Sequence, residues 1–265
     1  MSNNARTIPA ARTALDFSPA AAATPWRKLV LNHGLTEAKL ILRNGEQLMV
    51  TLLIPLGLLL FSHFAEGRYG ITENHIAPNV LALAIWSSCF TSLAIATAFE
   101  RRYGVLERLS ATPLGHGGLL AGKALGITMI ATGQFLLLGA IGQALGWRIT
   151  PSPMQWPILL VAVPLAMFIF ANLALAVAGL LRAEATLAFA NIIYLVGLLA
   201  GGIMWPVSSF PKVLQPVIAG TPTGALGEVL RHWTSGGVTW ISLLVLVVWA
   251  VLAHLLARKA FRWTS

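Results

Sequence analysis

The sequence is short of acidic side chains. Its 265 residues include nine aspartates and glutamates against eighteen lysines and arginines, and Asp16 is the sole aspartate. It contains neither a His-Glu-x-x-His nor a Gly-x-Ser-x-Gly motif, and no apolar run carries an aspartate that could serve as acid or base. We therefore expect no enzyme active site, no metal site and no cofactor site in this chain.

The sequence also has only one cysteine and no apolar run among its first 25 residues. Cys89 is alone, which excludes a disulfide within the chain, and its apolar surroundings favour a small buried residue. The first 25 residues contain Arg6 and Arg12 but no apolar run, so a cleaved signal peptide is not expected. We expect residues 1–25 to form a flexible cytoplasmic leader.

Apolar residues are abundant instead. They make up 57% of the chain, charged residues only 10%, and the mean hydropathy is +0.76. These values indicate an integral membrane protein. The apolar runs are continuous and do not alternate with a period of two, so they predict helices and not a β-barrel.

Six apolar runs are candidates for crossing a membrane, which takes about 20 residues. We therefore expect an all-α, six-span transmembrane domain over residues 48–265. The predicted spans are Leu48–Phe64, Ile76–Phe99, Ala124–Trp147, Pro157–Leu181, Thr186–Val207 and Val238–Ala257.

The basic residues predict the orientation of these spans. Fourteen of them fall on one side, and only Arg68, Arg148, Lys212 and Arg231 fall on the other. Because basic loops stay in the cytoplasm, both termini are predicted to be cytoplasmic. The net charge of +9 then reflects orientation and contact with anionic lipid, and no aromatic-basic motif points to nucleic acid.

The segment ahead of the first span, residues 26–47, is amphipathic. Leu31, Leu35 and Leu42 lie on one helical stripe, with Lys39 and Arg43 beside it. This pattern predicts a helix lying in the membrane interface. The turn signal Asn44-Gly45 separates the helix from the first span.

The second loop, Phe99–Gly115, has paired charges beside an apolar face. Two Glu-Arg pairs lie two turns apart, three apolar residues cluster on a neighbouring face, and a proline follows. Such a helix suits docking into a groove of a partner protein, while a solvated loop helix has the same composition. The residues are Glu100-Arg101, Glu107-Arg108, Val105, Leu106, Leu109 and Pro113.

The stretch GGLLAGKALG, Gly117–Gly126, nearly matches a phosphate-binding loop. A functional loop needs a Ser or Thr after Gly122-Lys123, but Ala124 stands there. The magnesium ion would also need an acidic residue at the end of an apolar strand, and the chain offers none. The glycines therefore indicate a glycine-rich helix start, with Lys123 reaching the cytoplasmic headgroups.

The run AFERRYGVLERLSATPLGHGGLLAGKAL, with LRNGEQLMVTLLIPLGLLLF before it, resembles the membrane subunit of ABC-2 type exporters, permeases related to the daunorubicin-resistance family. The likeness covers all six spans and is specific in the second loop. It implies that this loop is a coupling helix, seated on an ATP-binding subunit that binds ATP and Mg²⁺. The residues expected at that interface are Glu100, Arg101, Arg102, Gly104, Val105, Leu106, Glu107, Arg108 and Leu109, of which Arg102 and Val105 depart from the usual pattern.

The resemblance also implies an assembly. Two ATP-binding subunits and a second permease, identical or homologous, would complete the transporter in a bacterial cytoplasmic membrane. The family places spans one, two and five around the pathway, so Gly197-x-x-x-Gly201 in span five is expected at the seam between permeases.

Short external helices are expected between spans five and six. Apolar pieces at Val213–Ala219 and Ala225–Leu230 are too short to cross and are interrupted by prolines, which favours re-entrant helices, as the resemblance also implies. We expect Trp205, Pro222 and His232 to form an external gate. An aromatic belt at the interface also explains the tryptophan.

Neutral polar residues dominate the middle of the spans. Trp86, Ser87, Phe90, Thr91, Asn191 and Tyr194 are the predicted substrate pathway. Such a lining suits an amphipathic or hydrophobic substrate such as a drug, an antibiotic or a lipid-like molecule, and interhelical hydrogen bonding is the alternative for each polar group. The predicted function is the permease subunit of an ATP-driven exporter. The alternative, an ion-coupled secondary transporter, is disfavoured by the shortage of buried acids.

Overall fold

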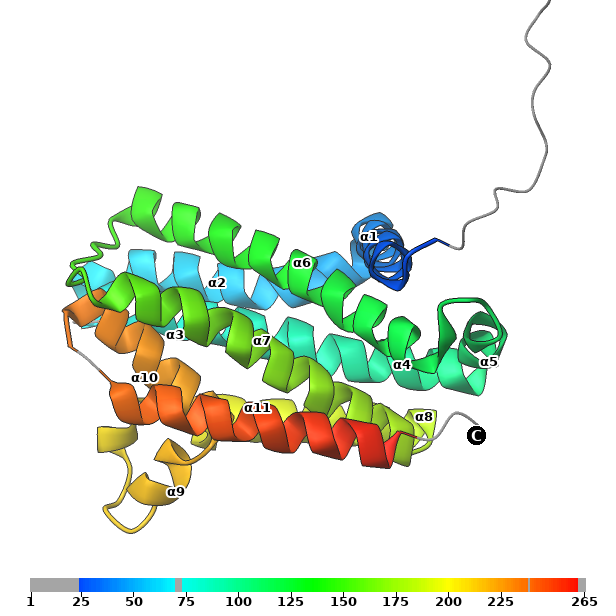
Figure 1. Ribbon diagram of the computed structural model, residues 1–265. Coiled ribbons are helices and arrows are strands. Elements are labelled where there is room, and N and C mark those ends of the chain that lie inside the picture. The colour runs from blue at the N-terminus through cyan, green and yellow to red at the C-terminus, as the bar shows by residue number, and fades with distance from the viewer. Residues whose placement is uncertain (1–23, 70–72, 238, 262–265) are drawn as a thin grey trace, which may run out of the picture.

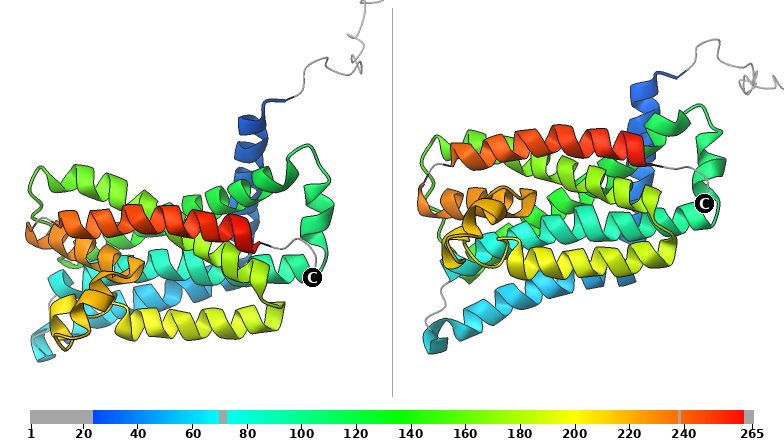
Figure 2. Two further views of the ribbon diagram at one scale, coloured as in Figure 1. Left: turned by 60° about the horizontal axis from the view of Figure 1, so that its bottom comes forward. Right: turned by 90° about the horizontal axis from the view of Figure 1, so that it is seen from below.

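The computed structural model describes residues 24–69, 73–237 and 239–261, and all regular secondary structure in these residues is helical (Figure 1). The predicted all-α class is therefore confirmed for this part of the chain. Residues 1–23 of the predicted leader lie outside the described residues. The long helices form an elongated bundle, and α1 (Trp26–Arg43) runs across its long axis (Figure 2).

Five segments of the described chain are long and apolar enough to cross a membrane. α2 (Gly45–Tyr69) contributes a shorter apolar stretch, Thr51–Phe64, and contains Pro55. The predicted count of six spans therefore depends on α2 and stays a prediction. The five segments are Ile76–Arg102, Gly115–Leu145, Gln155–Leu180, Ala183–Ala200 and Trp240–Ala260.

The last four of these segments are single helices: α6 (Gly115–Leu145), α7 (Gln155–Leu180), α8 (Ala183–Ala200) and α11 (Trp240–Ala260). Their bounds differ most from the predicted spans in α6, which begins at Gly115 and not at Ala124. α8 ends before the predicted Val207 because Gly202 adopts the left-handed backbone conformation, with φ of 76°.

The second span contains a π-helical turn. α3 (Glu73–Trp86) continues into the π-helix η1 (Ser87–Ser92) and then into α4 (Leu93–Arg102) without a break. A π turn holds extra backbone per turn, and such turns occur often at functional sites. α3 also forms the centre of the core with α7, where Leu81, Ile85 and Phe170 are fully buried.

The second loop is divided in two, in contrast to the single short helix, ended by Pro113, that was expected there. α4 ends at Arg102, and Gly104, with φ of 68°, separates it from the six-residue helix α5 (Val105–Ser110). A left-handed residue cannot continue a right-handed helix, so the first Glu-Arg pair belongs to the span and the second to α5.

Three short helices lie at the end of the bundle that is opposite to α5; we call it the α10 end (Figure 1). They are η2 (Val207–Ser209), α9 (Gln215–Ala219) and α10 (Pro222–Ser235). Thr221 caps α10, since its hydroxyl accepts a hydrogen bond from the N–H of Gly224 over 3.0 Å, and Pro222 follows in the first turn. The end that carries α5 and the last turn of α11 is called the α5 end.

Candidate functional site

A cavity of about 560 Å³ opens between α2, the π turn of the second span and α8. It is lined by four of the six predicted pathway residues, and its described lining contains no charged side chain. Those four are Ser87, Thr91, Asn191 and Tyr194. The hydroxyl of Thr91 is buried and has no hydrogen-bond partner among the described residues, so its hydrogen-bonding capacity is unused in this arrangement.

The other two predicted pathway residues lie behind this cavity. Trp86 and Phe90 stack with their ring centroids 4.3 Å apart, and Trp86 meets the ring of Phe170 edge-on at 4.8 Å. Both side chains are buried, and α8 comes close to the Trp86 indole at Gly197, where a Cβ would lie 2.7 Å from Nε1. These rings support the cavity wall and do not line it.

Three residues of α2 also line the cavity: Thr51, Ile54 and Pro55. The resemblance had placed span one beside the pathway, but these residues were not among the predicted pathway residues. Thr51 and Pro55 are four residues apart and therefore share a helical face, which is the signal that would have identified them. Gln134 on α6 links this wall to the π turn, because its amide donates to Thr51 Oγ1 over 3.2 Å and its carbonyl accepts from Ser88. Ser88 and Gln134 thus hydrogen-bond between helices, as one reading of the sequence predicted.

A second cavity of about 390 Å³ adjoins the first toward the α5 end, and both are lined by Asn44, Ser92 and Ala96. In contrast to the first cavity, it has charged groups in its wall. Glu37, Glu100 and Lys123 line it. The two cavities together extend from the α5 end to the π turn.

Lys123 is the centre of this charged group and is only 3% exposed. Its ammonium pairs with Glu37 of α1 over 3.1 Å and with Glu100 of α4. His33 lies 3.4 Å from Glu37. Burial lowers the pKa of His33; Glu37 acts in the opposite sense, and Lys123 lowers it further.

The glycines beside Lys123 serve helix packing. A Cβ on Gly122 would collide with His33, and one on Gly126 would lie 2.7 Å from Glu37 Cβ and 2.9 Å from the carbonyl oxygen of Gly34. α1 therefore crosses α6 at backbone distance, which only glycine allows. The likeness of this stretch to a phosphate-binding loop reflects this crossing.

The predicted coupling residues fall into two groups. One group points into the protein: Leu106 is fully buried, and the Arg101 guanidinium donates to the carbonyl oxygens of Gly179 and, over 2.5 Å, of Leu181. Arg102 pairs with Glu184 at the start of α8. Arg101 and Arg102 thus anchor α4 to the α7–α8 turn, whereas Glu100 pairs with Lys123 of α6.

The other group faces outward at the α5 end. Val105, Glu107 and Arg108 are exposed, Leu109 is half-buried, and the preceding Tyr103 is 66% exposed. Tyr103 was not predicted to belong to this surface. An exposed aromatic and an apolar residue beside a charged pair are the features by which a helix docks against another protein.

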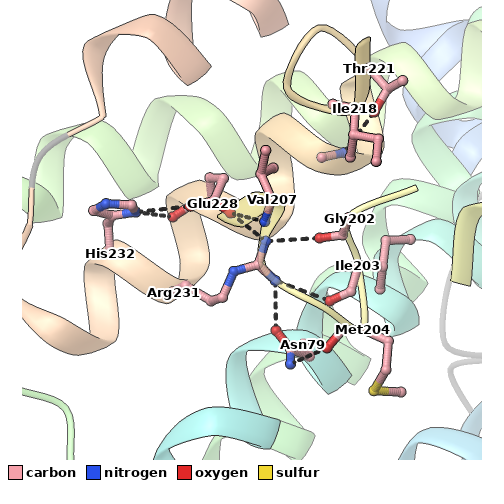
Figure 3. Close-up of polar contacts among 11 residues, drawn as sticks. Asn79, Gly202, Ile203, Met204, Val207, Ile218, Thr221, Glu228, Arg231 and His232 are labelled. Carbon is pink, nitrogen blue, oxygen red and sulfur yellow. Dashed lines mark hydrogen bonds and ion pairs between the residues drawn. The ribbon is translucent and has the colours of Figure 1, made fainter. Parts of the chain in front are cut away.

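At the α10 end, Arg231 joins three segments (Figure 3). Its guanidinium donates to Asn79 Oδ1 over 2.8 Å, and to the carbonyl oxygens of Gly202 over 2.8 Å and Ile203 over 3.1 Å. Glu228, one turn earlier on α10, accepts from the same guanidinium over 2.9 Å. This guanidinium therefore fixes α10 to α3 and to the chain that follows α8.

The surroundings of Glu228 on α10 favour the charged form of its carboxyl group. Burial alone would raise its pKa, but the N–H of Val207, 3.0 Å away, and Arg231 stabilise the carboxylate and lower the pKa below its ordinary value. Burial lowers the pKa of Arg231, and Glu228 acts in the opposite sense. The pair is ionised at neutral pH.

The three predicted gate residues occupy different surroundings. Trp205 is 55% exposed, and Pro222 is buried in the first turn of α10. His232 places Nδ1 2.8 Å from the carbonyl oxygen of Glu228 and 3.5 Å from its carboxylate. Of these residues, His232 has a direct contact with the Arg231–Glu228 pair.

Comparisons with known proteins match most of the chain, including residues at the α5 end and at the α10 end of the bundle. A family model described as ABC-2 type transporter matches residues 35–232. A Bacillus subtilis (strain 168) protein, provisionally named transport permease YvfS, is 22% identical over 233 residues, covering 85% of this chain and 94% of its own length. Both matches include the cavity and the α5 helix.

Proposed function

Because the chain belongs to the ABC-2 type transporter family, and so is a multi-pass transport permease of an ABC system, we propose that it is the membrane subunit of an ATP-driven exporter. ATP and Mg²⁺ bind a separate subunit, present twice, and a second permease completes the complex. The chain lies in a bacterial cytoplasmic membrane, with both termini and the α5 end in the cytoplasm and α2 as the first of six spans.

One observation carries this proposal: a single helical span forms the cavity wall and leads directly to the docking surface. The π turn lines the 560 Å³ cavity with Ser87 and Thr91, and the same span ends at Arg102, beside the exposed Glu107 and Arg108 of α5. A push on α5 therefore acts on an element that contacts the substrate.

The substrate follows from the cavity lining. Hydroxyl and amide groups of Thr51, Ser87, Thr91 and Asn191 stand among apolar walls, and none of the described lining residues is charged. This combination suits a neutral or weakly charged amphipathic molecule, whose hydrogen-bonding edge contacts the hydroxyls and whose apolar body fills the remainder. Drugs, antibiotics and lipid-like molecules have this character.

The mechanism uses the coupling residues that contact other helices of the chain. Closure of the ATP-binding subunits displaces α5, whose buried Leu106 and whose neighbour Arg102, paired with Glu184, transmit the movement to α8. α8 carries Asn191 and Tyr194, so the opposite cavity wall moves as well. ATP changes access only because its binding favours one arrangement of the bundle over the other.

The test is to purify the full chain with candidate ABC ATP-binding subunits and measure complex formation and ATPase activity. Arg108→Ala and Glu107→Ala should reduce substrate-stimulated ATPase activity at least about tenfold, a loss of roughly 1.4 kcal/mol of coupling. Lys212→Ala, at an exposed position near α9, is the matched control and should have no effect. Transport that persists without any ATPase would overturn the proposal in favour of an ion-coupled secondary transporter.

A further inference from the structure

A third cavity, of about 400 Å³, lies away from the two described above and shares no lining residue with them. α6 and α11 both pack against α7, and the cavity opens between them at the α5 end. We call it the α7 groove and define it by Gly117, Ala121, Phe168, Asn172, His254 and Arg258. The proposed transport cycle makes no use of it.

We propose that the α7 groove binds one phospholipid with an anionic headgroup from the leaflet at the α5 end. Arg258 holds the lipid phosphate, and an acyl chain lies between α6 and α11. Only the identification of this leaflet as cytoplasmic rests on the proposed function.

Polarity in the groove falls with depth. Arg258, in the last turn of α11, is an exposed cation at the rim. His254, four residues earlier and therefore about 6 Å deeper, places Nδ1 3.3 Å from Oδ1 of Asn172. Deeper still, the lining is apolar, with Phe168 and Ala124. A phospholipid has the same sequence of charged phosphate, polar glycerol esters and apolar chain within one leaflet.

Small residues make room for the acyl chain. Gly117, Ala121 and Ala124 lie on the α6 side of the groove, and a Cβ on Gly117 would meet no atom within 4 Å. Because this space faces hydrocarbon in a membrane, lipid tails fill it. The ring of Phe168, whose centroid is 5.8 Å from that of His254, forms part of the wall beside the chain.

The charge at the rim selects the headgroup. The last turn of α11 carries both Arg258 and Lys259, and only Arg258 lines the groove. Guanidinium groups bind phosphate through paired hydrogen bonds, and basic residues between transmembrane helices favour anionic headgroups. Phosphatidylglycerol carries a net negative charge, whereas phosphatidylcholine compensates its phosphate with its own cation, so the groove should prefer the former.

The test is native mass spectrometry of the purified full chain, titrated with phosphatidylglycerol and phosphatidylcholine of identical acyl chains. We expect one tightly bound phosphatidylglycerol, preferred about fivefold over phosphatidylcholine. Arg258→Gln should remove this preference. Lys259→Gln removes the same charge one residue away, outside the groove lining, and should leave the preference within twofold.

A second pair of variants tests the acyl-chain site. Gly117→Leu fills the groove and should abolish binding of this lipid even with Arg258 intact. Gly133→Leu is its matched control, because Gly133 lies on the same helix, also has open space around its Cα, and does not line the groove. Equal binding of both lipids, an equal effect of Lys259→Gln and Arg258→Gln, or undiminished binding in Gly117→Leu would overturn the inference. Since the measurement needs no ATPase, its failure leaves the proposed transport function untouched.

Discussion

Arg231 of α10 donates a hydrogen bond to Oδ1 of Asn79 at the start of the second span, over 2.8 Å. The two residues are 152 positions apart in the chain. The amide of Asn79 in turn donates to the carbonyl oxygen of Met204 over 2.9 Å, so the contact also fixes the chain after α8. α10 is therefore attached to the second span and to the chain that follows α8; the second span and α8 are two of the three elements that line the 560 Å³ cavity.

The first prediction concerns this attachment. Arg231→Met should destabilise the protein by about 3 kcal/mol, because it leaves Glu228 partly buried without its cation and three acceptors without a donor. For a chain of this size the melting temperature should fall by roughly 6 to 12 °C. The change in melting temperature is measured by thermal unfolding of the purified protein in detergent.

The double variant Arg231→Met with Glu228→Leu should recover part of this loss, since it removes the unpaired carboxylate as well. Lys212→Met deletes an exposed cation at the same end and should change stability by less than about 0.5 kcal/mol. Equal melting temperatures for Arg231→Met and Lys212→Met would contradict the prediction.

The second prediction concerns pH at the α1–α6 crossing. Burial lowers the pKa of His33 below its ordinary 6.5, with Glu37 opposing this and Lys123 adding to it. The folded state thus binds the His33 proton less readily than the unfolded chain does. The stability from this residue is fully present above about pH 6.5 and is lost as the pH falls through the lowered folded pKa.

Hydrogen exchange in α1, corrected for the intrinsic rate, should therefore become faster as the pH is lowered from about 7.5 to 5.5. His33→Gln should flatten this dependence. His116→Gln, at an exposed histidine in the first turn of α6, is the matched control and should retain it. A pH dependence that survives in His33→Gln would show that another group is responsible.

Hydropathy predicted the long helices well, because a continuous apolar run of about 20 residues has few other structures in a membrane. The contacts between these helices were predicted less well. Lys123 looked like a residue that reaches the headgroups, but it is buried between Glu37 and Glu100, which lie on other helices. The resemblance placed Gly197 at a seam between two permeases; within this chain it packs against Trp86, and a seam along span five stays a prediction.

The break at Gly104 and the π turn at Ser87–Ser92 show the same limit. A single glycine is compatible with a helix interior or a left-handed break, and the break here turns α5 so that its Leu106 is buried. Small polar residues in the π turn do not distinguish it from an α-helix. The predicted pathway residues nevertheless lie around one cavity in four of six cases, because they share one face of two spans.

The third prediction tests the close crossing of α1 over α6. Gly126→Ala should loosen this contact, because the added Cβ would lie 2.9 Å from the carbonyl oxygen of Gly34 and 3.2 Å from the N–H of Ala38, both backbone groups. Overpacking of this kind costs about 1–3 kcal/mol. Gly133→Ala, with open space on the same helix, should be neutral or slightly stabilising because alanine favours a helix.

Limited proteolysis within α1 distinguishes the two variants. Gly126→Ala should be cut faster there than the parent protein, and Gly133→Ala at the parent rate. Equal cleavage of both variants would mean that α1 does not depend on this glycine for its position.

The fourth prediction uses two threonines of the second span. Thr91 and Thr97 both have buried hydroxyls without a partner among the described residues, but only Thr91 lines the 560 Å³ cavity. Thr91→Val keeps the side-chain shape and removes the hydroxyl. If the substrate hydrogen-bonds there, its affinity should fall about threefold to tenfold, in keeping with the loss of one hydrogen bond of roughly 1 kcal/mol.

Thr97→Val makes the same chemical change outside the cavity and should leave affinity unchanged. The measurement is the concentration of an amphipathic substrate that half-maximally stimulates ATPase activity of the assembled complex, compared with basal activity. Basal activity should be the same in both variants, because both substitutions leave the exposed side chains of α5 unchanged. If Thr91→Val and Thr97→Val shift the half-maximal concentration equally, the effect comes from packing of the span, and the cavity beside the π turn is not where the hydrogen-bonding edge of the substrate binds.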